Sequence, residues 1–196
     1  ESSVTAGIGA GPWLVISPHD DDFILGMGLT IAQARQENID VYVLVVTDGR
    51  MGYASVEERD DLVATRHGEL KKACVELGID SDRLIELGYP DGSLTQYQGC
   101  NEVGDGLGQV LTGVIRNIRP EFVFAPTGND LHPDHRVVNR EVDMACCWAT
   151  SKIWLEKGEP LENLARRDYA VYCAFPRCPE LEIAGTDSLF QTKMTL

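Results

Sequence analysis

Short apolar segments alternate along this chain with longer segments of helical character. Residues 13–18 and 41–46 read WLVISP and VYVLVV, and neither shows the polar and apolar alternation of a half-exposed strand. A strand that is apolar on both faces has to be covered on both faces, as in the parallel sheets of α/β proteins. The sequence therefore predicts a three-layer, Rossmann-like α/β fold. We expect a mostly parallel sheet, helices on both of its faces and right-handed crossovers.

Strands and helices are expected in alternation. The predicted strands are residues 13–18, 41–46, 83–87, 121–126 and 169–174, and the predicted helices are residues 22–37, 55–77, 106–118 and 134–156. The segment 93–105 is rich in Ser, Gln, Gly and Asn and is expected to form a loop over the site. No repeat or linker interrupts the pattern, so we expect one domain across residues 1–196.

The charge of the chain limits the partners that it can have. The formal net charge is -14 at pH 7, whereas nucleic acids and anionic membrane surfaces are bound by clustered Lys and Arg. The longest apolar runs are far shorter than the roughly 20 residues of a membrane span. We therefore expect a protein that acts on a small molecule, binds no nucleic acid and has no membrane span. The chain contains no Asn-x-Ser/Thr glycosylation signal, which favours a cytoplasmic location.

Two acidic clusters that contain histidine follow two of the predicted strands. Pro-His-Asp-Asp-Asp occupies residues 18–22 and His-Pro-Asp-His occupies residues 132–135, and together they hold three of the four histidines. In a doubly wound sheet, ligands bind beyond the carboxyl ends of the strands, where the strand order reverses. If the two strands are neighbours across that point, His19 and His135 share one pocket.

These residue types at this spacing indicate a metal site. His19 and Asp22 are three residues apart at a strand-to-helix turn, close enough to bind one ion, and His135 would be the third ligand. Two histidines and one carboxylate leave a coordination position for water, which is typical of a catalytic rather than a structural zinc. A bound zinc lowers the pKa of that water to about 7.

Three further side chains of the clusters are candidates for catalysis. Asp21 is the natural general base, and His132 could stabilise an oxyanion and protonate the leaving group. Asp134 would orient one of the histidines through its other ring nitrogen. Each cluster alone also has a simpler interpretation, because Asp often caps helices and His-Pro-Asp-His suits a surface turn. Their joint position after two apolar strands favours the metal site, whereas His67, beside Arg66 in a predicted helix, is expected to be structural.

The two clusters resemble the signature of the PIG-L/LmbE-like zinc de-N-acetylase family. The first motif of that family usually runs His-Pro-Asp-Asp-Glu, and the second runs His-x-Asp-His. The resemblance extends through VTDG at residues 46–49, RHGEL at 66–70, LGI at 77–79 and LGYPDG at 87–92. It covers roughly residues 13 to 140 in order, which makes it specific rather than a match to a single motif.

The resemblance implies a set of site residues. It implies one zinc ion per chain, with His19, Asp22 and His135 as ligands, although such a site also accommodates Fe²⁺ or Co²⁺. Asp21 matches the general base of the family and His132 its electrophilic histidine. The substrate-binding residues that it implies are Arg66 and Asp91. A helix-face salt bridge of Arg66 with Glu69 or Asp61 is an equally good interpretation of that arginine.

The chain departs from the family pattern at two positions and at its end. Asp20 replaces the usual proline and Phe23 the usual glutamate. Asp is a competent turn residue, so the zinc site is expected to survive the first change. The family also commonly continues past the segment that resembles residues 181–194, so we expect a single deacetylase-like domain without that C-terminal tail.

The sequence as a whole predicts a metal-dependent hydrolase. Its predicted reaction removes an N-acetyl or similar acyl group from an amino-sugar-containing small molecule or glycoconjugate through a zinc-activated water. Two alternatives stay open: a zinc amidase or esterase that acts on a non-sugar substrate, and an inactive relative that only binds a glycan. A nucleotide-binding Rossmann protein is disfavoured, because the first strand leads to His19 and three aspartates where a pyrophosphate site has a Gly-rich turn.

Overall fold

The predicted α/β fold is confirmed by a five-stranded sheet in which every paired strand is parallel. The computed structural model describes residues 3–99, 105–178 and 187–195. Within them the strand order is β3-β2-β1-β4-β5. The strands are β1 (Trp13–Ser17), β2 (Val41–Thr47), β3 (Leu84–Tyr89), β4 (Phe122–Pro126) and β5 (Ala165–Tyr169).

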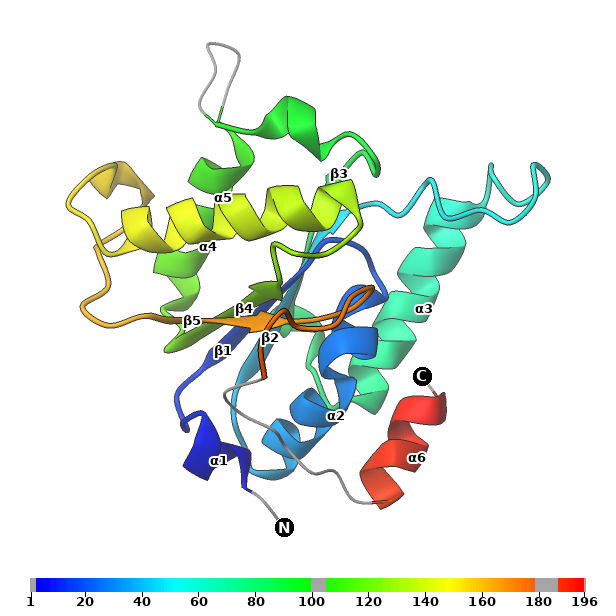
Figure 1. Ribbon diagram of the computed structural model, residues 1–196, viewed down its shortest axis with the longest axis horizontal. Helices are drawn as coiled ribbons and strands as arrows, with labels where there is room; N and C mark the ends of the chain where they lie inside the picture. The colour runs from blue at the N-terminus through cyan, green and yellow to red at the C-terminus, as the bar shows by residue number, and fades with distance from the viewer. Residues whose placement is uncertain (1–2, 100–104, 179–186, 196) are drawn as a thin grey trace.

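Helices cover both faces of the sheet (Figure 1). They are α1 (Val4–Gly7), α2 (Asp22–Gln36), α3 (Leu62–Glu76), α4 (Leu107–Ile118), α5 (Pro133–Ala149) and α6 (Asp187–Thr195). Trp13 and Val15 of β1 point to the core beneath α2 and α3, and Leu14 and Ile16 point to the core beneath α4 and α5. All four side chains are fully buried, as the apolar character of both faces predicts. None of the helices that the structure describes has the length and apolar content needed to cross a membrane.

The strand order places a crevice at the carboxyl end of β1. The chain pairs β1 with β2 on one side and with β4 on the other, so the order reverses at β1. This is the point at which open α/β sheets bind ligands. The first acidic cluster follows β1 directly, and the second begins at His132, after a short loop that leaves β4 at Pro126. The predicted meeting of the two segments is confirmed.

Two helices are shorter than predicted. Helix α3 begins at Leu62, because residues 55–61 (SVEERDD) lie largely in solvent and offer no apolar face to bury. Helix α5 ends at Ala149, where the guanidinium of Arg116 on α4 donates hydrogen bonds to the carbonyls of Trp148, Ala149 and Ser151. A buried arginine therefore satisfies the carbonyl groups that the end of the helix leaves open.

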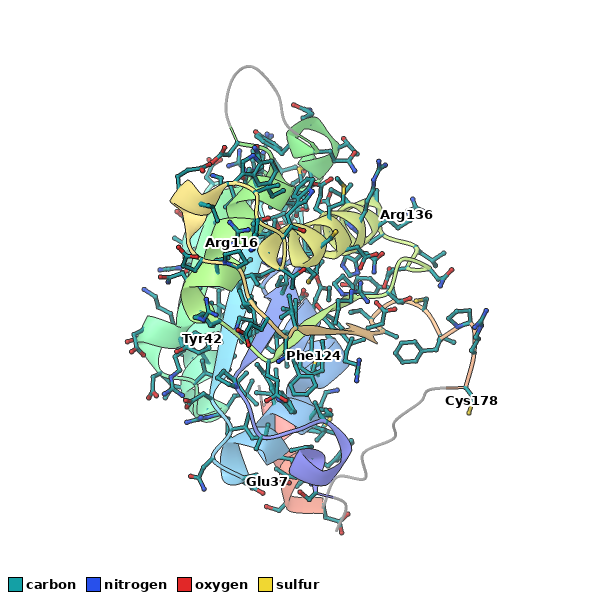
Figure 2. The ribbon with its side chains drawn as sticks, turned by 90° about the vertical axis from the view of Figure 1, so that its left-hand side faces the viewer. Glu37, Tyr42, Arg116, Phe124, Arg136 and Cys178 are labelled. Atoms are coloured by element: carbon teal, nitrogen blue, oxygen red, sulfur yellow. The ribbon has the colours of Figure 1, made fainter. Side chains whose placement is uncertain are left out.

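The fifth strand lies earlier than predicted. The apolar run at residues 169–174 predicted a strand there, but β5 spans Ala165–Tyr169 with the sequence ARRDY. An edge strand contacts solvent and does not need the apolar run of a buried strand. After Tyr169 the chain leaves the sheet, and Figure 2 shows this segment extending as far as Cys178. Of the predicted loop at 93–105, residues 94–97 form a 3₁₀ turn, and residues 100–104 lie outside the described part.

Candidate metal centre

The turn after β1 is built around the Asp22 carboxylate. The hydroxyl of Ser17 donates to the carbonyl of His19 at 2.6 Å and accepts from the N–H of Phe23 at 3.0 Å. The backbone N–H of His19 donates to Oδ2 of Asp22 at 2.9 Å. Phe23, which stands where the family has glutamate, is fully buried in the core. These contacts fix the His19 and Asp22 side chains at the edge of the crevice.

Three predicted ligands meet in a tight triangle. The Nδ1 atom of His19 lies 2.9 Å from Oδ2 of Asp22 and 3.3 Å from Nε2 of His135. The same Asp22 oxygen lies 3.0 Å from Nε2 of His135. Tetrahedral zinc with ligands at about 2.0–2.1 Å requires ligand atoms roughly 3.3 Å apart, so these donor atoms fit such an ion with little adjustment.

Charge and hydrogen bonding around the triangle also call for a cation. Oδ1 of Asp22 is buried and has no hydrogen-bond partner among the described residues. Burial lowers the pKa of His19, but hydrogen bonds to Asp134, Asp22 and Asp91 outweigh it and raise that pKa to about 12. Burial raises the pKa of Asp22, yet hydrogen bonds from His135 and His19 leave it lowered. A proton on His19 thus supplies the positive charge that a metal ion would otherwise bring.

Two other groups of side chains near His19 also bring ligand atoms within 4.8 Å of one another. One is His19, His132 and His135, and the other is His19, Asp91 and Asp134. Both share His19 with the predicted set. Asp22 faces Nδ1 of His19, whereas Asp91 and Asp134 face its Nε2.

A carboxylate oxygen lies close to the far nitrogen of each histidine ligand, although neither nitrogen makes a well-formed hydrogen bond among the described residues. Oδ2 of Asp130 lies 3.2 Å from Nδ1 of His135, and Oδ1 of Asp91 lies 3.1 Å from Nε2 of His19. Asp134 was expected to orient a histidine. Its Oδ2 lies 3.6 Å from Nε2 of His19 and accepts the N–H of Gly92 at 2.8 Å. Carboxylates in such positions set the tautomer and orientation of metal-bound histidines.

Asp130 was missed in the sequence, although it stands two residues before His132. Its Oδ1 accepts the N–H of His132 at 3.0 Å, and its Oδ2 accepts the N–H of Tyr172 at 3.2 Å. The Tyr172 ring packs 5.3 Å from the His135 ring, centroid to centroid. No pattern in the sequence indicates that contact, because Tyr172 belongs to the segment that was predicted to be a strand.

His132 lies at the first turn of α5 with its ring against the centre. Its Nδ1 accepts the N–H of Asp134 at 3.3 Å, which places the ring proton of the neutral form on Nε2. The ring centroid lies 4.6 Å from that of His19. Burial and the positive charges of His19 and His135 lower the pKa of His132. A neutral His132 is therefore a hydrogen-bond donor through Nε2.

Asp21 and Arg66 lie at the rim of the centre. The Asp21 side chain is 43% exposed, and its Oδ2 lies 3.7 Å from Nη2 of Arg66. Arg66 also donates through Nη1 to Oδ1 of Asp20 at 2.7 Å, instead of pairing along the helix face. Burial raises the pKa of Asp20, and Arg66 opposes the rise. His67 lies away from the centre and contacts Glu86 at 2.7 Å, as expected of a structural residue.

One known protein family matches the part of the chain that contains both acidic clusters. The family model described as GlcNAc-PI de-N-acetylase (PIG-L) matches residues 14–146. The chain belongs to the PIG-L family. The match spans β1 to α5 and therefore includes every residue of the predicted metal site.

Relatives within the PIG-L family include named deacetylases. A diacetylchitobiose deacetylase of Thermococcus kodakarensis is 35% identical over 127 residues, which are 63% of this chain and 44% of that protein. A Bacillus anthracis protein named "Probable N-acetyl-alpha-D-glucosaminyl L-malate deacetylase 2" is 32% identical over 135 residues, 66% of this chain and 56% of that protein. The chain spans about half the length of the curated relatives that it matches.

The fold is shared with solved structures of the family. The N,N'-diacetylchitobiose deacetylase of Pyrococcus horikoshii superimposes with a TM-score of 0.80 over 99% of this chain and 71% of that one. The two sequences are 24% identical, so this likeness shows the common fold.

Proposed function

We propose that this protein is a zinc-dependent deacetylase that removes an N-acetyl group from an amino-sugar-containing small molecule or glycoconjugate. The observation that carries the proposal is the triangle of His19, Asp22 and His135, with donor atoms 2.9 to 3.3 Å apart. It lies at the ligand-binding point of the sheet, in a chain of the PIG-L family. Zinc is the metal proposed, because two histidines and one carboxylate suit it.

The proposed metal ligands are His19, Asp22 and His135. A divalent ion held by them would polarise the acetamide carbonyl and make water acidic enough to attack at neutral pH. Asp130 and Asp91 lie beside the far nitrogens of the two imidazoles, where they would orient the rings. Both oxygens of Asp91 are already engaged, by His19 and by the N–H of Met51, so we assign Asp91 to support of His19.

Asp21 is the proposed general base. It is adjacent to Asp22 in sequence, its side chain reaches solvent, and it makes no contact with the histidine ligands among the described residues. Its carboxylate is therefore free to take the proton of the attacking water.

His132 is the proposed electrophile, which acts as a hydrogen-bond donor. Its Nε2–H faces the centre, because Nδ1 is occupied by the backbone of Asp134. From there it would donate a hydrogen bond to the oxygen that becomes negative when water adds to the amide. The proton taken up by Asp21 would pass to the departing amine so that it leaves neutral. Asp134 fixes the position of His132 through its backbone and the turn at Gly92 through its carboxylate.

The test is metal content measured together with acetate release. The purified protein, the Asp22→Ala, His135→Ala double variant and the Asp40→Asn control would be analysed for metal. Each would then be assayed on N-acetylglucosamine and N,N'-diacetylchitobiose. Near-stoichiometric zinc and acetate release in the first and third proteins, but not in the second, support the proposal. Zinc without acetate release from any amino sugar would point to a non-sugar amidase or esterase, and the absence of metal after zinc addition would point to a binding protein.

A further inference from the structure

Arg66 is held in a confined position at the rim of the metal centre. Its Nη1 donates to Oδ1 of Asp20 at 2.7 Å, and the two side chains are 22% and 13% exposed. On the other side, a Cβ atom at Gly49 would lie 2.9 Å from Nη1, and one at Gly52 would lie 3.0 Å from Cζ. Gly49 also has a φ of +65°, which L residues rarely adopt. The two glycines therefore leave room for the guanidinium, which faces Asp20 and Asp21 of the first motif.

Arg50, a second arginine in this region, is also paired with an aspartate. Nε of Arg50 donates to Oδ2 of Asp48 at 2.7 Å, and Oδ1 of Asp48 accepts the N–H of Asp91. Within the part of the chain that the structure describes, Arg50 and Arg66 are thus each paired with an aspartate. Asp21, at the mouth, adds a further carboxylate. Three carboxylates, those of Asp20, Asp21 and Asp48, thus lie beside two guanidinium groups, which predicts an acidic entrance to the centre in a chain whose net charge is -14.

We propose that Asp20 is a specificity-determining residue that cancels the charge of Arg66, so that the site selects uncharged amino sugars over anionic ones. The inference rests on the proposed function, because it specifies the substrate class of that same site. An arginine free of Asp20 would attract a carboxylate or phosphate on the substrate. Paired with Asp20, it offers N–H donors to sugar hydroxyls but no net attraction for an anion. Asp20 contacts Arg66 and not the substrate, so its effect is exerted through the arginine.

Equilibrium binding tests the inference without turnover. The ligands are N-acetylglucosamine and N-acetylglucosamine 1-phosphate, and their Kd values for zinc-loaded wild-type and Asp20→Asn protein would be measured by calorimetry. The Asn variant keeps the shape of Asp20 and removes its charge. We expect the affinity for the phosphate to rise by roughly fivefold, the effect of one unit charge at about 4 Å in a water-like medium. The affinity for the neutral sugar should stay within about twofold.

The direct attraction of the phosphate for the metal is present in both the wild-type and the Asp20→Asn protein. It therefore cancels when their Kd values are compared. In an Asp20→Asn, Arg66→Gln double variant the gain should disappear, because the uncompensated cation is gone. The Asp40→Asn variant, which breaks an exposed pair with Arg83 remote from the site, should leave both affinities unchanged. Equal changes for both ligands in Asp20→Asn, or no binding of either ligand to the wild-type protein, would overturn the inference.

The unmodified protein provides a second measurement. Screening of an acidic entrance should strengthen binding of the phosphate as ionic strength rises from 0.01 to 0.15 M, where the Debye length falls from about 30 to about 8 Å. Binding of the neutral sugar should not change. Affinity for the phosphate that falls with salt would contradict the inference. Acetate release is measured separately. Selective binding without acetate release would contradict the proposed deacetylase activity and still support the proposed role of Asp20 in specificity.

Discussion

Oδ2 of Asp130 lies 3.2 Å from Nδ1 of His135, and both side chains are almost completely buried. The same carboxyl group accepts the N–H groups of His132 and Tyr172. Burial raises the pKa of Asp130, but these backbone hydrogen bonds and His135 leave it lowered. An ionised Asp130 beside Nδ1 would favour the His135 tautomer that carries its proton there, which leaves Nε2 to bind a metal.

Replacement of Asp130 should weaken metal binding. We expect Asp130→Ala to reduce zinc affinity by about 10- to 100-fold, the usual effect of losing a carboxylate that supports a histidine ligand. Competition with a chromophoric chelator measures this affinity. The matched control is Asp143→Asn, an exposed aspartate on α5 that pairs with Arg166 away from the centre. Unchanged zinc affinity in Asp130→Ala would show that His135 is oriented by other contacts.

Substitutions at Asp21 and at His135 should have different effects, the first on turnover and the second on zinc binding. Asp21→Asn keeps the size of a side chain that contacts no predicted ligand, so zinc content should be normal. Turnover should fall by about 10²- to 10⁴-fold, because the base is lost. His135→Ala should instead lose zinc, as measured by elemental analysis of the desalted protein. Activity of Asp21→Asn close to that of the wild type would reject Asp21 as the base.

The sequence predicted the buried strands of the sheet, because burial leaves an apolar pattern. It did not predict the edge strand, whose position depends on tertiary contacts. Strands β1, β2 and β4 are apolar on both faces, so their burial and the crevice between the two clusters could be inferred. The edge strand β5 carries Arg166, Arg167 and Asp168, and no periodicity distinguishes it from a loop. The apolar run at residues 169–174 predicts a strand there instead. It instead turns toward the centre, where Tyr172 packs on His135.

In the site, too, the metal ligands could be predicted from the sequence, whereas most of the side chains that contact them could not. His19, Asp22 and His135 follow predicted strands, so sequence position was enough to bring them together. Asp134 was expected beside a histidine, but the contact of Asp91 with His19 was not predicted, because it spans 72 residues of chain. The pairing of Arg66 with Asp20 likewise depends on how α3 packs beside the turn after β1. Sequence spacing had suggested only partners on the helix itself.

Arg116 is expected to be essential for stability and not for chemistry. Its buried guanidinium donates to four carbonyls around the end of α5, those of Trp148, Ala149, Ser151 and Trp154. Arg116→Met should lower the free energy of unfolding by about 3–5 kcal/mol, because the carbonyls lose a charged donor in a buried site. Urea denaturation measures the loss, and Arg140→Met, an exposed arginine on α5, is the control. A loss below about 1 kcal/mol would show that water replaces the guanidinium.

Metal binding and apoprotein stability should depend on pH in opposite directions. In the metal-free protein the pKa of His19 is raised from 6.5 to about 12, through hydrogen bonds that outweigh burial. The stabilisation from this proton is complete below pH 6.5 and is lost as the pH rises toward 12. The unfolding free energy of the apoprotein should therefore fall by up to about 1.4 kcal/mol per pH unit above pH 6.5.

Zinc must displace that proton, so its affinity should rise with pH by about tenfold per unit over the same range. Chelator competition at three pH values between 6.5 and 8.5, corrected for the chelator's own protonation, measures the slope. The His67→Gln variant, in which the histidine outside the centre is removed, should show the same slope as the wild type. A zinc affinity independent of pH would mean that His19 is already neutral in the apoprotein and that the surrounding aspartates do not hold a proton there.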